Sequence, residues 1–303
     1  MSGALWALAA GAGFGLFQSF NRQAVRGMNV YFATFVQLAV SALILAMIAV
    51  LTEDLNSLFT APLRAHFYFV AAGFFHFLIG WTFLNASQKK IGAARTSPLI
   101  GTNPVFGTVI AAVTLRELPS LLELAGVGVI VVGAYLISSE NLDSNNVNGY
   151  SNSKSLNSIL QASWLGLSAA FFWALSPIFI RLGLKDLPSP LLGVTIGVTA
   201  SALAYGMILL WQRRQWMNLP ITGEAWTYKL LAGILVGLST WMRWVALDLT
   251  SVAAVLALSM ISVPTVIVLS PLISGKHLER VTTILVTGTT MILGGTLLLI
   301  LNP

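Results

Sequence analysis

The sequence predicts an all-α integral membrane protein in which ten transmembrane helices form two inverted five-helix repeats. Hydrophobic residues make up 56% of the 303 residues and charged residues only 9%, whereas a soluble domain carries roughly 25% charged residues. The mean hydropathy is +0.84. Most of the surface must therefore face lipid, because too few polar side chains exist to solvate it in water.

Ten apolar segments are long enough to cross the hydrocarbon core as helices. Charged residues, Pro and Gly mark their boundaries. The first segment runs on for too many residues to be the apolar part of a signal peptide, and no basic residue precedes it, so we expect it to remain as the first span. The expected spans are 3–21, 30–51, 66–88, 93–114, 120–138, 162–180, 189–211, 228–248, 251–272 and 280–301.

The second half of the chain contains a weaker copy of a pattern in the first half. When residues 82–139 are laid over residues 242–299, Pro104 meets Pro264, Arg116 meets Lys276 and Leu118 meets Leu278. We therefore expect a first repeat at 1–139, a polar linker rich in Ser and Asn at 140–161, and a second repeat at 162–303. Because each repeat has an odd number of spans, the second repeat must insert upside down, as in many secondary transporters.

The order of motifs in the first copy resembles the EamA pattern of the drug/metabolite transporter superfamily. The elements are an apolar helix ending in Ala, an Ala-rich helix with a mid-helix Pro, a short charged turn and a Gly-rich last helix. The resemblance implies a ten-helix permease with a central cavity lined by helices one, three, four, six, eight and nine. The residues that carry it are Ala86, Ala93, Ala94, Pro104, Arg116, Glu117 and the stretch from Gly126 to Gly133.

Composition excludes several kinds of site. The chain has no cysteine, so disulfides, iron–sulfur clusters and thiolate zinc sites are impossible. No Walker lysine follows a glycine loop, and no His, Asp and Glu residues have metal-ligand spacing. The sequence therefore predicts no metal and no cofactor. The net charge of +6 arises from Lys and Arg at segment ends, which indicates contacts with lipid head groups rather than with nucleic acid.

Ionisable residues at membrane depth are candidates for a transport site, because burying them in lipid is costly. His76 lies in the middle of the third span and either lines a cavity or makes a neutral bond between helices. Arg243 and Arg95 lie within their spans, and each either faces the cavity or extends its side chain to the interface. His76 is the one mid-membrane residue that we expect to carry protons; facilitated diffusion and exchange are equally open.

Neutral polar and aromatic side chains in the same segments extend the candidate site. Asn21, Gln37 and Asn85 are further polar groups at depth. A proline in a helix frees a backbone carbonyl, so Pro104 and Pro264 are the expected helix kinks. The predicted substrate-binding residues are Phe14, Gln18, His76, Trp81, Arg95, Asn103, Trp173, Trp241 and Arg243.

The charges predict the class of substrate. All acidic residues lie in loops or at segment ends, and the first acid in the chain is Glu53. A cationic drug would find no anion in the cavity, and cations would repel it. We therefore expect a secondary transporter, not an enzyme, that moves a small anionic or zwitterionic metabolite of the amino-acid or organic-acid type.

Two alternatives stay open: a membrane sensor or scaffold that does not transport, and an enzyme that modifies lipids. The enzyme would need paired acids, a metal cluster or a Ser/His/Asp set, none of which the sequence offers at one depth. We expect a multi-pass protein of the plasma or inner membrane. The distribution of Lys and Arg places both termini outside, whereas the resemblance implies cytoplasmic termini, so orientation stays open, as does the oligomeric state.

Overall fold

All secondary structure in the described part of the chain is helical. The computed structural model describes residues 3–91, 96, 99–116, 119–147, 156–211, 223–274 and 283–301. The first five helical segments are α1 (Gly3–Arg26), α2 (Val30–Thr52), the short α3 (Asn56–Thr60), α4 (Leu63–Gly73) and the π-helix η1 (Phe74–Gly80). They are followed by α5 (Trp81–Ile91), α7 (Asn103–Thr114), α8 (Leu121–Val147), α9 (Leu156–Leu184) and α10 (Pro190–Trp211). The last are α12 (Gly223–Leu249), α13 (Val252–Leu258), the 3-10 turn η2 (Ser259–Ile261), α14 (Ser262–Ser274) and α15 (Thr283–Leu301).

The protein is an all-helical membrane protein. In the described ranges, six helices are long and apolar enough to cross a bilayer, fewer than the ten spans expected from the sequence. The other expected segments provide shorter apolar helices, namely Asn103–Thr114, Leu121–Gly133 and Val252–Val266. Large apolar side chains such as Leu43, Val109 and Leu203 are exposed, as is expected of a surface that lipid covers. The six long segments are Gly3–Arg26, Val30–Thr52, Leu63–Lys90, Trp164–Leu184, Pro190–Trp211 and Gly223–Leu249.

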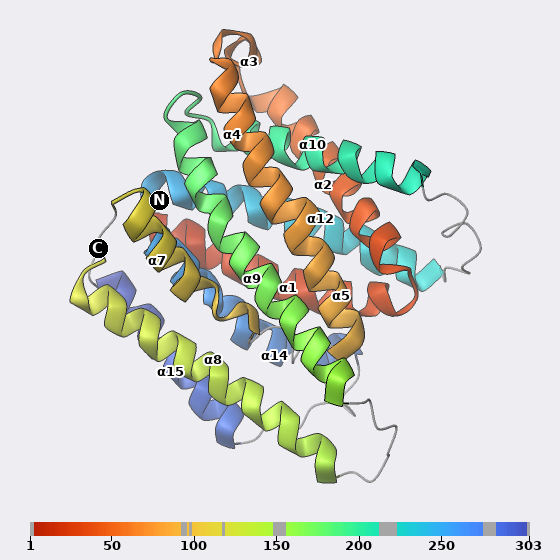
Figure 1. Ribbon diagram of the computed structural model, residues 1–303, viewed down its shortest axis with the longest axis vertical. Coiled ribbons are helices and arrows are strands. Elements are labelled where there is room, and N and C mark those ends of the chain that lie inside the picture. The colour runs from red at the N-terminus through yellow and green to blue at the C-terminus, as the bar shows by residue number, and fades with distance from the viewer. Residues whose placement is uncertain are drawn as a thin grey trace.

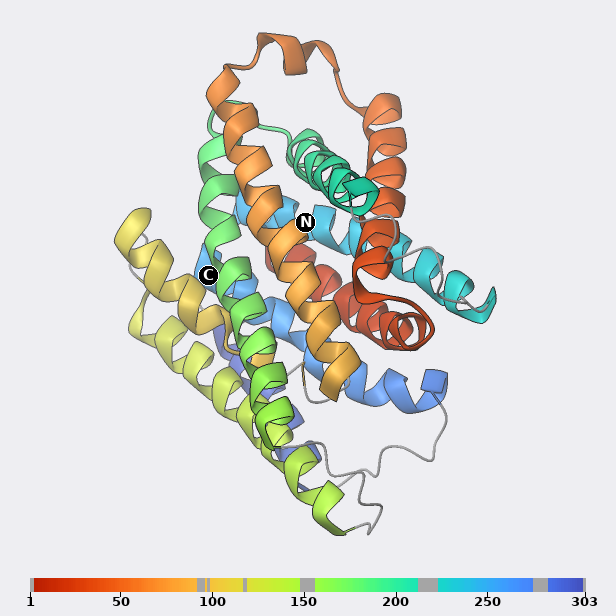
Figure 2. The same cartoon turned by 45° about the vertical axis from the view of Figure 1, so that its right-hand side comes forward.

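Helices from distant parts of the sequence pack side by side. The continuous segment from α4 to α5 runs along α9 (Figures 1 and 2), and α1 packs along α12. Helices α8 and α15 lie together at one edge of the molecule (Figure 1). Their close approach requires glycine, because a Cβ on Gly133 would lie 2.6 Å from the carbonyl oxygen of Gly288. Small residues of this kind permit the backbone contact on which helix association in lipid relies.

The two candidate kink prolines lie at helix starts. Pro104 is in the first turn of α7, not in the middle of a helix as the sequence indicated. This position costs no hydrogen bond, since the first N–H groups of a helix have no partner within it. Pro264 lies near the start of α14, directly after the 3-10 turn η2. The helix is thus interrupted just before Pro264, which has no N–H to continue the pattern.

Helical structure also extends into the expected linker from both sides. Helix α8 continues to Val147 and α9 begins at Leu156, so much of the range 140–161 is helical. Asn, Ser and Asp lower helix propensity only modestly, and a helix that has already formed can continue through them.

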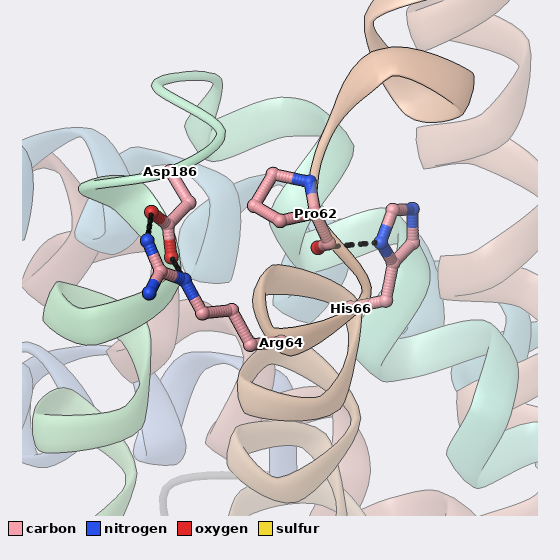
Figure 3. Close-up of polar contacts among 4 residues, drawn as sticks. All are labelled: Pro62, Arg64, His66 and Asp186. Carbon is pink, nitrogen blue, oxygen red and sulfur yellow. Dashed lines mark hydrogen bonds and ion pairs between the residues drawn. The ribbon is translucent and has the colours of Figure 1, made fainter.

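An ion pair joins the start of α4 to the segment that follows α9 (Figure 3). The Arg64 guanidinium donates to both carboxylate oxygens of Asp186, from Nε over 2.8 Å and from Nη2 over 2.7 Å. About half a turn along α4, the half-buried His66 ring contacts the carbonyl oxygen of Pro62 through Nδ1 over 3.4 Å. Arg64 precedes His76 by roughly 18 Å along the helix, so these contacts hold a helix end and take no part in the pocket described next.

Candidate functional site

A small pocket lies between helices of both halves of the chain. Its lining combines aromatic rings, aliphatic side chains and a few buried polar groups. Sites for small molecules usually have this composition. The lining residues are Phe14, Phe17, Gln18, His76, Trp81, Ile100, Asn103, Trp173, Arg243, Leu256, Ser259, Met260 and Ser262.

His76 and Arg243 meet in this pocket. The guanidinium Nη2 of Arg243 lies 3.2 Å from His76 Nδ1. Because arginine can only donate, Nδ1 accepts this bond, which leaves the hydrogen of the neutral ring on Nε2. Both side chains are buried, with exposed fractions of 1% for His76 and 4% for Arg243. His76 therefore makes a bond between helices and also lines the cavity, the two roles that the sequence left as alternatives.

The Arg243 guanidinium keeps unused capacity to bind an anion. Its Nε has no hydrogen-bond partner among the described residues. Its Cζ lies 5.9 Å from the centroid of the Phe14 ring, within range of a cation–π contact. Among the described residues that line the pocket there is no carboxylate, and Arg243 carries their one permanent charge.

A π-helical turn shapes one wall. His76 lies within η1, and its carbonyl oxygen accepts a bond from the Trp81 N–H five residues later. The same oxygen accepts the indole N–H of Trp173 over 3.0 Å. The Trp173 and His76 rings stack with centroids 5.2 Å apart. Wide turns of this kind occur frequently at functional sites. Here the residue in the turn, His76, bonds to Trp173 through its carbonyl oxygen and to Arg243 through its ring nitrogen.

Two amide side chains of the pocket lining have oxygens without partners in the described part of the chain. Gln18 Oε1 and Asn103 Oδ1 are buried and have no hydrogen-bond partner among the described residues. The amide nitrogen of Asn103 donates to the carbonyl oxygen of Ala170 over 2.8 Å, which sets the orientation of that amide and leaves its oxygen as the free acceptor. A buried acceptor without a partner is costly, so a donor group on a ligand would stabilise both residues.

The structure brings seven of the nine predicted site residues to this pocket. Trp241 lies elsewhere: its ring packs against Trp6, with centroids 6.4 Å apart. Arg95 is outside the described residues. The prolines 104 and 264 are buried next to the pocket segments but do not line the pocket. The seven that gather are Phe14, Gln18, His76, Trp81, Asn103, Trp173 and Arg243.

Sequence reasoning missed the serines Ser259 and Ser262 and the lysine Lys229. The serines flank the 3-10 turn before Pro264, so the proline was the available signal. Lys229 lies close to the start of an apolar segment, where a lysine normally reaches the interface. Helix α12 instead begins at Gly223 and buries Lys229 completely, with an exposed fraction of 0%.

Lys229 is the centre of a second polar group of side chains, which we name the Lys229 cluster. Its Nζ donates to Asn21 Oδ1 over 2.5 Å and to Gln37 Oε1 over 2.7 Å. Asn21 Nδ2 donates in turn to Asn85 Oδ1 over 2.8 Å and to Gln88 Oε1 over 2.7 Å. Asn85 Nδ2 donates to Thr34 Oγ1 over 2.7 Å. The cluster thus ties α1, α2, α5 and α12 together through the three polar residues predicted at depth and three others.

The described ranges contain no group of three or more His, Cys, Asp or Glu residues that could hold a metal ion.

Comparison with known proteins gives the family of the first half of the chain. The profile of the EamA-like transporter family matches residues 1–139. No curated protein sequence matches the chain. One solved crystal structure of a protein has the same fold at a TM-score of 0.70 and 14% identity, and the match covers 97% of each chain. Residues 1–139 of this multi-span membrane protein therefore belong to the EamA-like transporter family.

Proposed function

We propose that the protein is a secondary transporter that moves a small anionic or zwitterionic metabolite of the amino-acid or organic-acid type. The observation that carries this proposal is the buried Arg243 guanidinium in a pocket whose described lining residues include no carboxylate. A guanidinium pairs with a carboxylate or phosphate through short, charge-assisted hydrogen bonds. A cation would instead meet an unshielded positive charge in surroundings of low dielectric.

The unpaired amide oxygens support the zwitterionic form. Gln18 Oε1 and Asn103 Oδ1 can accept from the ammonium group of an amino acid while Arg243 holds the carboxylate. The rings of Phe14, Trp81 and Trp173 supply apolar surface for the rest of the molecule. An organic acid would use Arg243 alone and leave both amide oxygens unpaired, so this arrangement favours amino acids.

Transport would proceed by alternating access between two inverted five-helix repeats, residues 1–139 and 162–303, joined through 140–161. The pocket takes residues from both ranges, with Phe14, His76 and Asn103 in the first and Trp173 and Arg243 in the second. A site at the interface between repeats opens to either side when one repeat rocks against the other. We place the protein in the plasma or inner membrane and assign it no enzymatic activity, in keeping with the family of its first half.

The test is exchange of radiolabelled compounds in proteoliposomes. Proteoliposomes that contain the purified protein are loaded with one compound at a time from a panel of L-amino acids and di- and tricarboxylates. Counterflow of the same compound in labelled form is then measured. We expect at least one carboxylate to exchange and Arg243→Gln to reduce its exchange at least tenfold. The matched control is Arg64→Gln, which removes an arginine at a helix end and should leave exchange unchanged.

Two results would contradict the proposal. If no compound in the panel exchanges, the protein is not this transporter, and binding without counterflow would identify a sensor. If a compound exchanges equally well through Arg243→Gln, Arg243 does not bind the substrate.

A further inference from the structure

Lys229 has an unusual environment for a lysine in a membrane protein. Its side chain is completely buried, and its hydrogen bonds go to two neutral amide oxygens, Asn21 Oδ1 and Gln37 Oε1. No carboxylate of the described chain pairs with it. Burial of an isolated ammonium costs far more than burial of a neutral amine, so the charge state of Lys229 must be explained.

The hydrogen-bond directions in the Lys229 cluster follow from Lys229 itself. Lysine here donates, so the acceptors on Asn21 and Gln37 must be their oxygens. The amide nitrogen of Asn21 is then the group that donates to Asn85 and Gln88. The donor at Lys229 thus sets the orientation of each amide along this chain of bonds.

Counting hydrogens distinguishes the two protonation states. A neutral amine has two hydrogens, and the cluster offers two acceptors, so each hydrogen has a partner. An ammonium has three hydrogens and would leave one unused. The cluster also ends in two buried amide nitrogens, Gln37 Nε2 and Gln88 Nε2, that have no partner in the described part of the chain. It therefore already has more donors than acceptors, which disfavours a further hydrogen on Lys229.

The Lys229 cluster adjoins the substrate pocket. Asn21 follows Gln18 by one turn of α1, and Asn85 follows Trp81 by one turn of α5. The bonds from Asn21 to Asn85 and Gln88 therefore join α1 to α5 about one turn beyond the pocket lining. Separation of α1 from α5 at this point would break these bonds and let water reach Lys229.

The titratable groups on the neighbouring helices do not provide a negative charge that would pair with an ammonium at Lys229. The elements packed against α12 are α1, α2, α9, α10 and α13. Their titratable residues are bases and tyrosines, namely Arg22 and Arg26 on α1, Tyr31 on α2, Arg181 on α9 and Tyr205 on α10. The acids Glu224 and Asp248 lie on α12 itself, and the bonds of Lys229 go to Asn21 and Gln37. The Tyr205 hydroxyl bonds to Thr82 Oγ1 over 2.6 Å.

We propose that Lys229 is the proton-binding site that couples transport to a pH gradient, a role that rests on the transport function proposed above. In the arrangement described here the amine is neutral and the Lys229 cluster is closed. When the cluster opens, a proton from water adds to the lone pair of Nζ and forms an ammonium. Closing requires that proton to leave towards water in the pocket, so each cycle carries one proton from the cluster side to the pocket.

The experiment compares two modes of transport in the same proteoliposomes. Counterflow at equal pH measures exchange alone, and accumulation under an imposed pH gradient of either sign measures coupling. The probe is a ¹⁴C-labelled mixture of L-amino acids. Lys229→Gln keeps two N–H donors but cannot titrate, and Lys229→Arg keeps a permanent charge. Lys185→Met removes an exposed lysine and serves as the control.

For the wild type and Lys185→Met we expect exchange and at least a threefold accumulation driven by the pH gradient. Lys229→Gln should retain exchange within about threefold and lose the accumulation. Lys229→Arg should lose both, because a permanent cation opposes closure. Melting temperatures in detergent separate these effects from misfolding, and Lys229→Met provides a second neutral variant if Lys229→Gln does not fold.

Three outcomes would overturn this inference. In each of them the wild type still exchanges substrate, so the proposed transport function is not affected. The first is accumulation by Lys229→Gln equal to that of the wild type. The second is a wild type that exchanges but never responds to a pH gradient. The third is loss of accumulation, with exchange retained, only in His76→Gln, which would identify His76 as the proton carrier.

Discussion

The indole N–H of Trp173 donates to the main-chain carbonyl of His76 over 3.0 Å, and the same two residues stack their rings. This pair joins α9 to the π-helical turn η1, so a residue of the second half of the chain holds the shape of a wall built by the first. The stacking holds the His76 ring, whose Nδ1 accepts from Arg243, against the indole. The stability of the pocket thus depends on contacts that couple the two halves.

We predict that Trp173→Phe destabilises the protein modestly. Phenylalanine keeps an aromatic ring against His76 but has no N–H for the carbonyl, and loss of one such bond costs about 0.5–1.5 kcal/mol. The measurement is the thermal unfolding midpoint in detergent, with Phe172→Leu as a neighbouring aromatic change. A midpoint equal to that of the wild type would show that water replaces the indole N–H without cost.

Gly80→Ala should lower the stability of the protein, for a different reason. A Cβ at this position would overlap the indole ring of Trp173, and overpacking of this kind costs about 1–3 kcal/mol. The matched control is Gly128→Ala, since a Cβ on Gly128 meets nothing within 4 Å. In an open helix position this change stabilises by up to about 1 kcal/mol.

The paired measurement is the melting temperature of both alanine variants together with their tryptophan fluorescence. Gly80→Ala should lower the melting temperature and shift the emission of the displaced indole, and Gly128→Ala should do neither. Equal melting temperatures for the two variants would mean that Trp173 moves aside freely.

Gln18→Leu tests which part of the substrate the amide recognises. Its Oε1 is buried without a partner in the pocket, and leucine is similar in size but cannot accept a hydrogen bond. We expect the KM for amino-acid exchange to rise about 10-fold, corresponding to roughly 1.4 kcal/mol, and that for dicarboxylates to stay unchanged. A rise that is equal for both classes would assign Gln18 to pocket shape rather than to the ammonium group.

Asn85→Leu tests the Lys229 cluster as a structural unit. The change leaves Asn21 Nδ2 and Thr34 Oγ1 each without one partner, and a buried polar group without its partner costs about 1–3 kcal/mol. The midpoint of thermal unfolding should therefore fall. The control is Thr52→Ala, which removes an exposed hydroxyl bond within α2 and should have little effect. An unchanged midpoint for Asn85→Leu would show that the cluster adds nothing to stability.

The residues that could be predicted as site members share one property. His76 and Arg243 are polar groups deep inside apolar segments, where lipid offers them no partner, so the physics of the bilayer alone indicates a protein interior. Trp241 satisfies the same positional argument but packs on Trp6, because the direction in which a helical side chain points depends on the neighbouring helix. Lys229 lies near the start of an apolar segment, where its position predicts contact with the interface, yet it is completely buried.

Composition and hydropathy by themselves determined that the chain is helical and lives in a membrane, because a backbone in lipid must satisfy its own hydrogen bonds. They also determined the absence of thiol chemistry and placed the acids away from the membrane interior. The tertiary structure alone decided that His76 bonds to Arg243, that Pro104 begins a helix, and that Asn21, Gln37 and Lys229 form one cluster. These facts depend on which helix faces come together, and that choice is made by close packing between segments far apart in the sequence.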